Sequence, residues 1–157
     1  MRVIGIDPGY DRLGVAILEG DVHTQRLIFS TCITTDKKAS IPHRLHEAGA
    51  ALANIVKEHA PARLGIETLF FNKNVKTALN VAEARGVILY VCQAHGVPVF
   101  EYSPQAIKIA VTGHGASGKE QVEDMLRRLV KNIPSRALDD EYDAIAAAVT
   151  CLVTERH

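Results

Sequence analysis

The chain has 157 residues, of which 47% are hydrophobic and 23% charged, a composition typical of one globular domain with a sizeable core. Its 18 basic and 18 acidic residues balance to a formal net charge of zero, which argues against a surface that is basic throughout, as in many nucleic-acid binders. No apolar stretch approaches the ~20 residues that span a bilayer, and the chain runs directly into a strand without a signal peptide, so we expect a cytoplasmic protein without membrane contact.

The first predicted element is a buried strand that ends in a carboxylate. Residues 3–6 are an unbroken apolar run, as expected for a central strand covered on both faces. Asp7 ends this strand, Pro8-Gly9 forces a turn, and residues 14–18 are predicted to return as an antiparallel strand. Burying Asp7 costs free energy unless hydrogen bonds or a cation compensate its charge. Taken alone, the segment is explained equally well by an ordinary turn-forming aspartate.

Hydrophobic periodicity predicts the next elements. Alternation over 26–35 indicates a third strand, and helical spacing after Ser40-Ile41-Pro42 indicates a helix that ends at Ala60-Pro61. Residues 63–67 repeat the pattern of the first strand, because this apolar run also ends in a carboxylate, Glu67. A long helix over 74–95 and a fifth strand over 97–102 complete the expected sheet.

The last third of the chain is predicted to be helical. A short helix over 105–111 is followed by a glycine-rich loop, and Ser117-x-x-Glu120 is typical of a capping box that starts the next helix. Asn132-Ile133-Pro134 breaks that helix, and a final helix runs from about 139 to 155.

This order of elements predicts one mixed α/β domain spanning residues 1–157. Strands 3–6, 63–67 and 97–102 are expected to form the parallel centre of a five-stranded mixed sheet, flanked by the antiparallel hairpin and covered by helices. This arrangement is similar to the ribonuclease H-like fold. The three cysteines, odd in number and widely separated, are expected to be buried thiols of a reducing compartment.

Four carboxylates are expected to converge at one edge of this sheet. Asp7 and Glu67 end strands that would lie side by side, and Asp140 and Asp143 project from one face of the last helix. The alanines at 144 and 146–148 leave that helix thin enough to approach the sheet closely. A solvated helix-start residue is the alternative for Asp140, since the helix dipole favours an acid there. Four converging carboxylates repel one another unless their pKa values shift or cations bind.

All-oxygen ligation suits magnesium or manganese, which are hard ions held by carboxylates and water. Two such ions ~3.5–4 Å apart can activate a water and stabilise the leaving oxygen of a phosphodiester. The cluster therefore predicts metal-dependent phosphodiester hydrolysis.

Four motifs follow one another over nearly the whole chain. They are Gly5-Ile6-Asp7-Pro8-Gly9 with Gly14; Glu67-x-x-Phe70-Phe71-x-x-Asn74-x-x-Thr77-Ala78 with Ala84-Arg85-Gly86; Pro104-x-x-x-Lys108 through Gly113-x-Gly115-x-x-x-Lys119-x-Gln121-Val122; and Asp140-x-x-Asp143-Ala144-Ile145-Ala146. In content and order they resemble the RuvC family of Holliday junction resolvases.

The resemblance implies a magnesium-dependent homodimeric endodeoxyribonuclease that nicks two opposed strands of a four-way DNA junction in recombination and repair. It implies two Mg²⁺ per active site, for which Mn²⁺ can substitute, and it leaves open whether a branch-migration motor complex is a partner. The residues that match the family's four metal-binding catalytic carboxylates are Asp7, Glu67, Asp140 and Asp143. Glu141-Tyr142 depart from the small residues that the family often places there, but helical positions between the two aspartates need not face the metals.

The resemblance also implies DNA contacts. Phe70 matches the family's junction-inserting aromatic, and Lys108 and Lys119 match its DNA-contacting lysines. Phe70-Phe71 alone would suit a core, but the Asn72-Lys73-Asn74 that follows indicates a surface loop, where an aromatic ring can stack on an unpaired base. Lys73 and Lys76 flank this segment and are expected either to touch phosphates or to lie on a solvated face. The long helix over 74–95 is expected to form the dimer contact, near Ala78 and Val81.

Rival interpretations are weaker. Gly113-x-x-x-x-Gly118-Lys119 matches most of a phosphate-binding P-loop, but Glu120 stands where a magnesium-binding Ser or Thr is required. An actin-like ATPase would need further motifs and a longer chain. An RNase H-like nuclease acting on structured RNA would share the first turn but not the segments around Phe70 and Lys119. A non-catalytic junction-binding scaffold would have no use for four repelling carboxylates.

Overall fold

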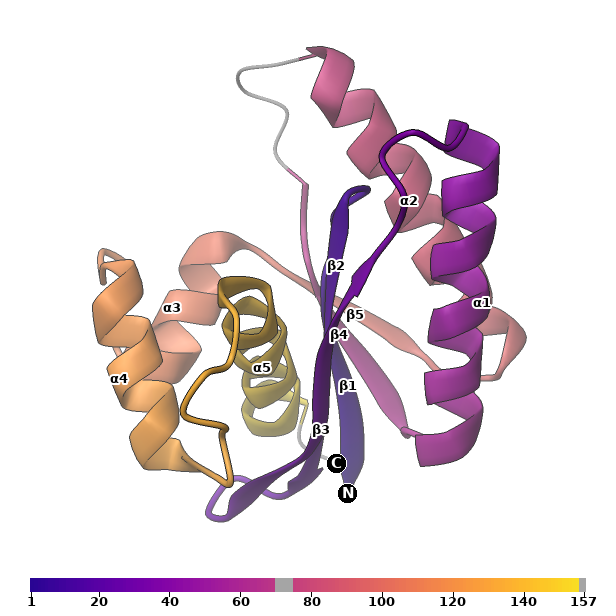
Figure 1. Ribbon diagram of the computed structural model, residues 1–157. Helices are drawn as coiled ribbons and strands as arrows, with labels where there is room; N and C mark the ends of the chain where they lie inside the picture. Colours follow the sequence, from indigo (N-terminus) through magenta and orange to yellow (C-terminus); the bar gives the residue numbers. More distant parts are fainter. Residues whose placement is uncertain (70–74, 156–157) are drawn as a thin grey trace.

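The computed structural model describes residues 1–69 and 75–155 and consists of a mixed sheet between two layers of helices. Figure 1 shows α1 and α2 on one face of the sheet and α3, α4 and α5 on the other. The strands are β1 (Arg2–Asp7), β2 (Arg12–Gly20), β3 (Gln25–Thr34), β4 (Arg63–Glu67), β5 (Val99–Tyr102) and β6 (Val130–Lys131). The helices are α1 (Ile41–His59), α2 (Val75–Ala94), α3 (Pro104–Thr112), α4 (Lys119–Leu129) and α5 (Asp139–Thr154).

The sheet has six strands in the order β5-β4-β1-β2-β3-β6, one more than the five predicted from the sequence. The additional strand, β6, has two residues and pairs in parallel with the start of β3, where Val130 lies opposite Gln25 and Lys131 opposite Arg26. Val130 continues the helical spacing of the preceding segment, so the local pattern extends the helix through it. Val130 and Lys131 instead form a strand, because they pair with the free edge of β3.

The centre of the sheet has the predicted pairing. β1 runs antiparallel to β2, with Asp7 opposite Gly14, and parallel to β4, with Ile6 opposite Ile66. β4 is in turn parallel to β5. Because parallel strands end at the same edge, Asp7 and Glu67 finish next to each other at the carboxyl ends of β1 and β4.

Helix α5 lies directly on this centre, and glycines in the strands make the approach possible. A Cβ atom added to Gly5 would lie 2.0 Å from the carbonyl oxygen of Ala144, and one added to Gly14 would lie 2.0 Å from that of Asp140. Any side chain at these two positions would therefore push α5 away from the sheet. The small residues on both elements fix the height of α5 above β1 and β2 and so the place of its first turn.

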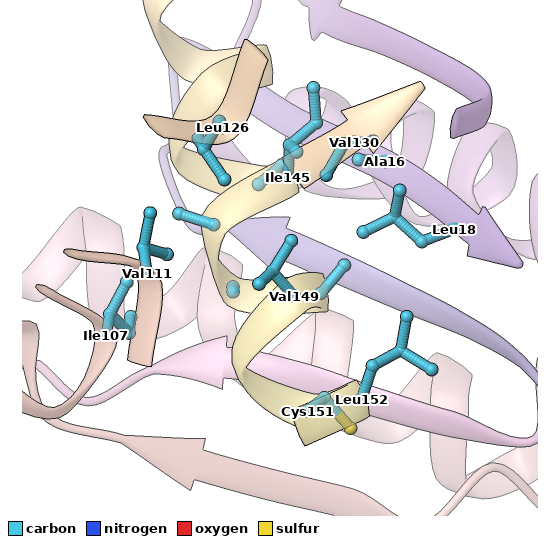
Figure 2. Packing of buried hydrophobic residues seen from close by; sticks show 14 of the residues in the cluster. Ala16, Leu18, Ile107, Val111, Leu126, Val130, Ile145, Val149, Cys151 and Leu152 are labelled. Carbon is cyan, nitrogen blue, oxygen red and sulfur yellow. The ribbon is translucent and has the colours of Figure 1, made fainter. Parts of the chain in front are cut away.

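Each face of the sheet has its own core. On one face, residues of α1 and α2, such as Leu52 and Ile88, pack on Ile4 and Ile6 of β1. On the other, α5 is the central element; Figure 2 shows it between α3 side chains on one side and those of β2 and β6 on the other. Complete burial of large aliphatic side chains, each stabilising the fold by about 1.5–3 kcal/mol, anchors the strand ends that carry the carboxylates.

All three cysteines are free thiols; Cys92 and Cys151 are buried, as predicted, whereas Cys32 is only half-buried. Burial raises the pKa of Cys92 to about 12 and that of Cys151 to about 11, so both stay protonated at neutral pH. In the described part of the chain, no helix is long and apolar enough to cross a membrane.

Candidate active site

The four predicted carboxylates lie near one another where three elements end or begin. Asp7 ends β1, Glu67 ends β4, and Asp140 and Asp143 lie in the first turns of α5. The close packing at Gly14 places the backbone of Asp140 directly over the start of β2. Asp7 is consequently within electrostatic range of Glu67, Asp140 and Asp143 at once.

Burial and mutual repulsion change the protonation of this cluster. The pKa of Asp7 is raised to about 7, first by burial and then by the charges of Asp143, Asp140 and Glu67. Burial and the charge of Asp143 also raise the pKa of Glu67, although Lys108 acts in the opposite direction. The pKa of Asp143 is raised mainly by burial and lowered in part by Lys119. The protein's own cations thus leave the negative charge of the cluster undercompensated.

Two of the lysines predicted to contact DNA, Lys108 and Lys119, lie at the border of this cluster. Lys108 and Lys119 line a hollow of about 240 Å³ together with Glu67 and Asp143. The Nζ atom of Lys119 is 3.1 Å from Oδ2 of Asp139 and 3.8 Å from Oδ2 of Asp143. Lys119 therefore lies beside the hollow, where a bound phosphate would have a cation as neighbour.

Sequence reasoning missed Arg12, which forms an ion pair with Asp140. Arg12 is the first residue of β2, and its side chain is about half exposed. Its partner lies at the other end of the chain, so the only local signal was a cation five residues after Asp7. Arg12 holds the Asp140 carboxylate at the rim of the cluster.

A second missed residue, Arg44 of α1, fixes the turn that follows Asp7. Arg44 is 5% exposed; its Nε donates to Oγ1 of Thr35 at 2.9 Å, and one Nη donates to the carbonyl oxygen of Tyr10 at 3.1 Å. The same Nη pairs with the carboxylate of Asp11, whose pKa is lowered chiefly by this hydrogen bond. The guanidinium also lies over the Tyr10 ring, 5.3 Å from its centroid. The turn therefore leaves β1 in a defined direction.

The two residues between the last aspartates take no part in the carboxylate cluster. One oxygen of Glu141 accepts a hydrogen bond from Oγ of Ser30 at 2.6 Å, and the other accepts one from the backbone N–H of Leu138 at 2.9 Å, which caps α5. Tyr142 is 3% exposed in the core beneath Arg127. Their departure from small residues thus leaves the cluster unobstructed.

Three predicted DNA-binding residues are not placed. Phe70 and Lys73 lie outside the described residues, and so does the side chain of Lys76, although its backbone belongs to the first turn of α2.

The chemistry of the donor set fits a hard divalent cation. Within residues 1–69 and 75–155, no three His, Cys, Asp or Glu side chains are gathered closely enough to enclose a metal ion by themselves. Magnesium does not require such an enclosure, because it usually binds through one or two carboxylates and keeps several waters. An excess of mutually repelling carboxylate oxygens beside an open hollow is the arrangement that such an ion stabilises.

Comparisons with known proteins place the chain in a family. The family model "Crossover junction endodeoxyribonuclease RuvC" matches residues 3–151. A RuvC of that description from Thermosipho melanesiensis is 42% identical over 155 residues, which cover 99% of this chain and 98% of the relative. One from Brevibacillus brevis is 38% identical over 152 residues, covering 96% of this chain and 90% of the relative.

Solved structures agree with this assignment. RuvC of T. thermophilus in complex with a Holliday junction substrate superimposes with a TM-score of 0.90 at 29% identity, over 96% of this chain and 92% of that one. The yeast mitochondrial Holliday junction resolvase Ydc2, at 14% identity and a TM-score of 0.70 over 96% of this chain and 77% of its own, shows the shared fold alone. The ribonuclease H-like arrangement expected from the sequence is thereby confirmed. The chain belongs to the RuvC family of crossover junction endodeoxyribonucleases.

Proposed function

We propose that this chain resolves Holliday junctions as a homodimer, making paired symmetric nicks in a four-way DNA junction during recombination and repair. In this proposal residues 1–157 act as one nuclease domain. The observation that carries it is the undercompensated cluster of Asp7, Glu67, Asp140 and Asp143 at the sheet edge, in a chain of the crossover junction endodeoxyribonuclease family. A non-catalytic scaffold would have no reason to keep this repulsion.

The four carboxylates would hold the magnesium ions. When bound, two such ions supply an activated water and stabilise the charge that develops on the leaving oxygen of the phosphodiester. Asp7, at the end of a rigid buried strand, would fix the position of the reacting phosphate relative to the helix-borne Asp140 and Asp143. Lys108 and Lys119, at the rim of the hollow, would bind phosphate oxygens and exclude misaligned strands.

The homodimer follows from the chemistry of symmetric cleavage. Two cuts of equal polarity on opposed strands require two identical sites in inverted orientation, which a two-fold dimer provides. Helix α2 supports this, because Leu79 is 61% exposed and Tyr90 is 75% exposed on it. These residues are eleven apart, close to three helical turns, and so share one face. Two large exposed apolar side chains on one face of a helix suit contact with a second copy of the chain.

The test is cleavage of a labelled four-way junction and of a linear duplex, with and without magnesium. We expect nicking of the junction only, and only with magnesium. Asp7→Asn, Glu67→Gln and Asp143→Asn should abolish nicking and retain junction binding, since each removes a metal ligand with little change in size. Asp140→Asn should act in the same direction. The matched control is Glu58→Gln, which removes a carboxylate from the exposed end of α1 and should cut at the wild-type rate.

The same gel separates the alternatives. Magnesium-dependent cutting of a structured RNA in preference to the DNA junction would assign the site to RNA processing. Tight junction binding without any nicking would identify a scaffold. Wild-type nicking by any one of the four variants would remove that residue from the metal site.

A further inference from the structure

The C-terminal end of α4, far from the carboxylates, carries a concave cationic surface that takes no part in the proposed active site. A hollow of about 400 Å³ is lined by Arg127, Arg128 and Lys131, with Val130, Asn132 and Ile133 between them. We call this hollow the basic bowl. No acidic residue lines it. The segment 127–138 holds these three cations and Arg136 but no Asp or Glu.

This local excess stands out because the chain as a whole is neutral. Removing these four cations from the 18 basic residues leaves 14 against 18 acidic ones, so the rest of the molecule is net negative. Basic residues elsewhere in the molecule pair with a carboxylate, as Arg2, Arg12 and Arg85 do. By contrast, none of the four forms an ion pair with any residue in the described ranges.

The bowl is held open by the fold. Val130 is 3% exposed and belongs to β6, which is paired with β3. Asn132 turns the chain back with a left-handed backbone, at φ 69°. Arg127 lies over the buried Tyr142 ring, 5.1 Å from its centroid, and donates to the carbonyl oxygen of Ser135 at 3.4 Å. Arg128 and Lys131 are exposed beside this fixed wall, so their charge is available to a ligand.

The helix dipole accounts for only part of the cluster. Cations in the last turn of a helix are favoured by its negative end, and Arg127 and Arg128 lie in the last turn of α4. Lys131 and Arg136 lie beyond the helix and gain nothing from that dipole. Because Lys131 and Arg136 lie in the same segment without any acidic residue, we expect an anionic ligand, rather than a group of this chain, to balance their charge.

The distance between the bowl and the carboxylates fits a DNA backbone as that anion. Lys119, at the first turn of α4, touches the carboxylate cluster, and Arg128 lies nine residues further, about 14 Å along the helix axis. Duplex DNA carries one negative charge per ~1.7 Å of its axis, so a duplex seated at the carboxylates passes many phosphates within this distance. The carboxylates themselves repel DNA, and a neutral protein therefore needs cations away from the site to bind it.

We propose that the basic bowl binds backbone phosphates of a duplex arm of the junction, away from the phosphodiester that is cut. This inference rests on the proposed function for its ligand, and it names where a protein without net charge holds its substrate. Arg128 and Lys131 are the contacting residues, while Arg127 supports the wall of the bowl.

The test measures binding without cleavage. Affinity for a four-way junction is determined over a salt series in EDTA for the wild type, Lys131→Ala and Arg128→Ala/Lys131→Ala. Each lost phosphate contact should flatten the log–log salt slope by about 0.9, so the double variant should flatten it by about 1.8. The lysine-matched control is Lys57→Ala, exposed on α1 across the sheet, which should leave the slope unchanged.

Further arms exclude a folding defect. Arg128→Lys/Lys131→Arg keeps the charge and should restore the wild-type slope, and all variants should melt at the same temperature. Junctions whose arms are trimmed to end before the bowl should bind wild type and double variant equally. An unchanged slope in the double variant would overturn the proposal, as would an equal loss on trimmed and full arms. If the bowl bound an acidic protein instead of DNA, the double variant would keep the wild-type salt slope.

Because binding is read in EDTA, failure of this inference is distinct from failure of the proposed function. If the wild type nicks junctions and the double variant keeps the wild-type salt slope, the bowl contact is refuted and the proposed function stands. If the double variant flattens the salt slope but the wild type does not nick junctions, the bowl contact stands and the proposed function is refuted.

Discussion

At the scale of single residues, the protonation of Asp7 shows that the folded structure disfavours an ionised carboxylate at this position. Burial and three negative neighbours raise its pKa from 3.8 to about 7, so the folded protein favours the neutral form. The resulting stabilisation is fully present below about pH 4, where the unfolded chain is protonated as well. It is lost as the pH rises through about 7, because the folded chain must then carry the charge.

This leads to a prediction for the metal-free protein. Asp7→Asn removes the ionisation, so in EDTA its free energy of unfolding should match the wild type near pH 4 and exceed it at pH 8 by a few kcal/mol, at ~1.4 kcal/mol per unit of pKa shift. Denaturant titrations at both pH values measure this. Asp124→Asn, on the exposed face of α4, is the control and should follow the wild type.

Magnesium should reverse the order at pH 8. An ion that binds the folded carboxylates stabilises the wild type in proportion to its occupancy, whereas the variant has lost a ligand. Parallel pH profiles for Asp7→Asn and wild type in EDTA would contradict the electrostatic account of the cluster.

At the scale of elements, the contact between α5 and the sheet decides whether a site exists. The backbone of α5 sits where a Cβ atom on Gly5 would be, 2.0 Å from the carbonyl oxygen of Ala144 and 2.5 Å from the backbone nitrogen of Ala148. Neither is the mobile end of a side chain. The helix cannot adapt locally and must move as a unit, and it carries Asp140 and Asp143 with it.

We therefore predict that Gly5→Ala disables the enzyme through geometry. It should lower the free energy of unfolding by about 1–3 kcal/mol or more, as overpacking does, and should abolish junction nicking although every carboxylate remains. Gly118→Ala, where a Cβ atom would meet nothing within 4 Å, is the matched control. Gly118, rather than the Ser117 expected from the sequence, is the N-cap of α4, so this substitution should cost only what a changed N-cap costs, ~1 kcal/mol or less. Wild-type stability in Gly5→Ala would show that α5 tolerates displacement.

At the scale of the whole molecule, the two layers of helices serve different purposes. The layer of α3, α4 and α5 carries Asp140 and Asp143, the two site lysines, and Arg127 and Arg128 of the basic bowl. The other layer carries α2 with its exposed Leu79 and Tyr90. Ala78 and Val81, the positions suggested by the sequence, are half-buried, so Leu79 and Tyr90 are the better test of the predicted dimer.

We predict that Leu79→Glu/Tyr90→Glu converts a wild-type dimer into monomers at micromolar concentration, measured by sedimentation. Paired nicks on one junction should become independent, since the two sites are no longer held together. Val22→Glu, which places the same charge on an exposed apolar residue of the β2–β3 turn, is the control and should remain dimeric. A monomeric wild type would contradict the homodimer itself.

The sequence alone was sufficient to predict the pairing at the centre of the sheet and the convergence of the four carboxylates at its edge. Apolar runs that end in Asp7 and Glu67, and a helix with Asp140 and Asp143 on one face, are local patterns with a single reasonable packing. The order of the motifs added the family, which the comparisons confirm. Contacts of the Phe70 segment and of Lys73 and Lys76 stay predictions, because those side chains lie outside the described residues.

Only the tertiary structure decided β6, Arg12, Arg44 and the basic bowl. A two-residue strand has no periodicity of its own, and it exists because the edge of β3 offers free hydrogen-bonding groups. The roles of Arg12 and Arg44 depend on their ion pairs with Asp140 and Asp11, which are distant in sequence and come close only in the folded chain. The bowl needed the turn at Asn132 to gather cations that the sequence presents as an ordinary charged stretch. Local patterns encode which elements form, whereas pairings between distant residues depend on how the finished layers meet.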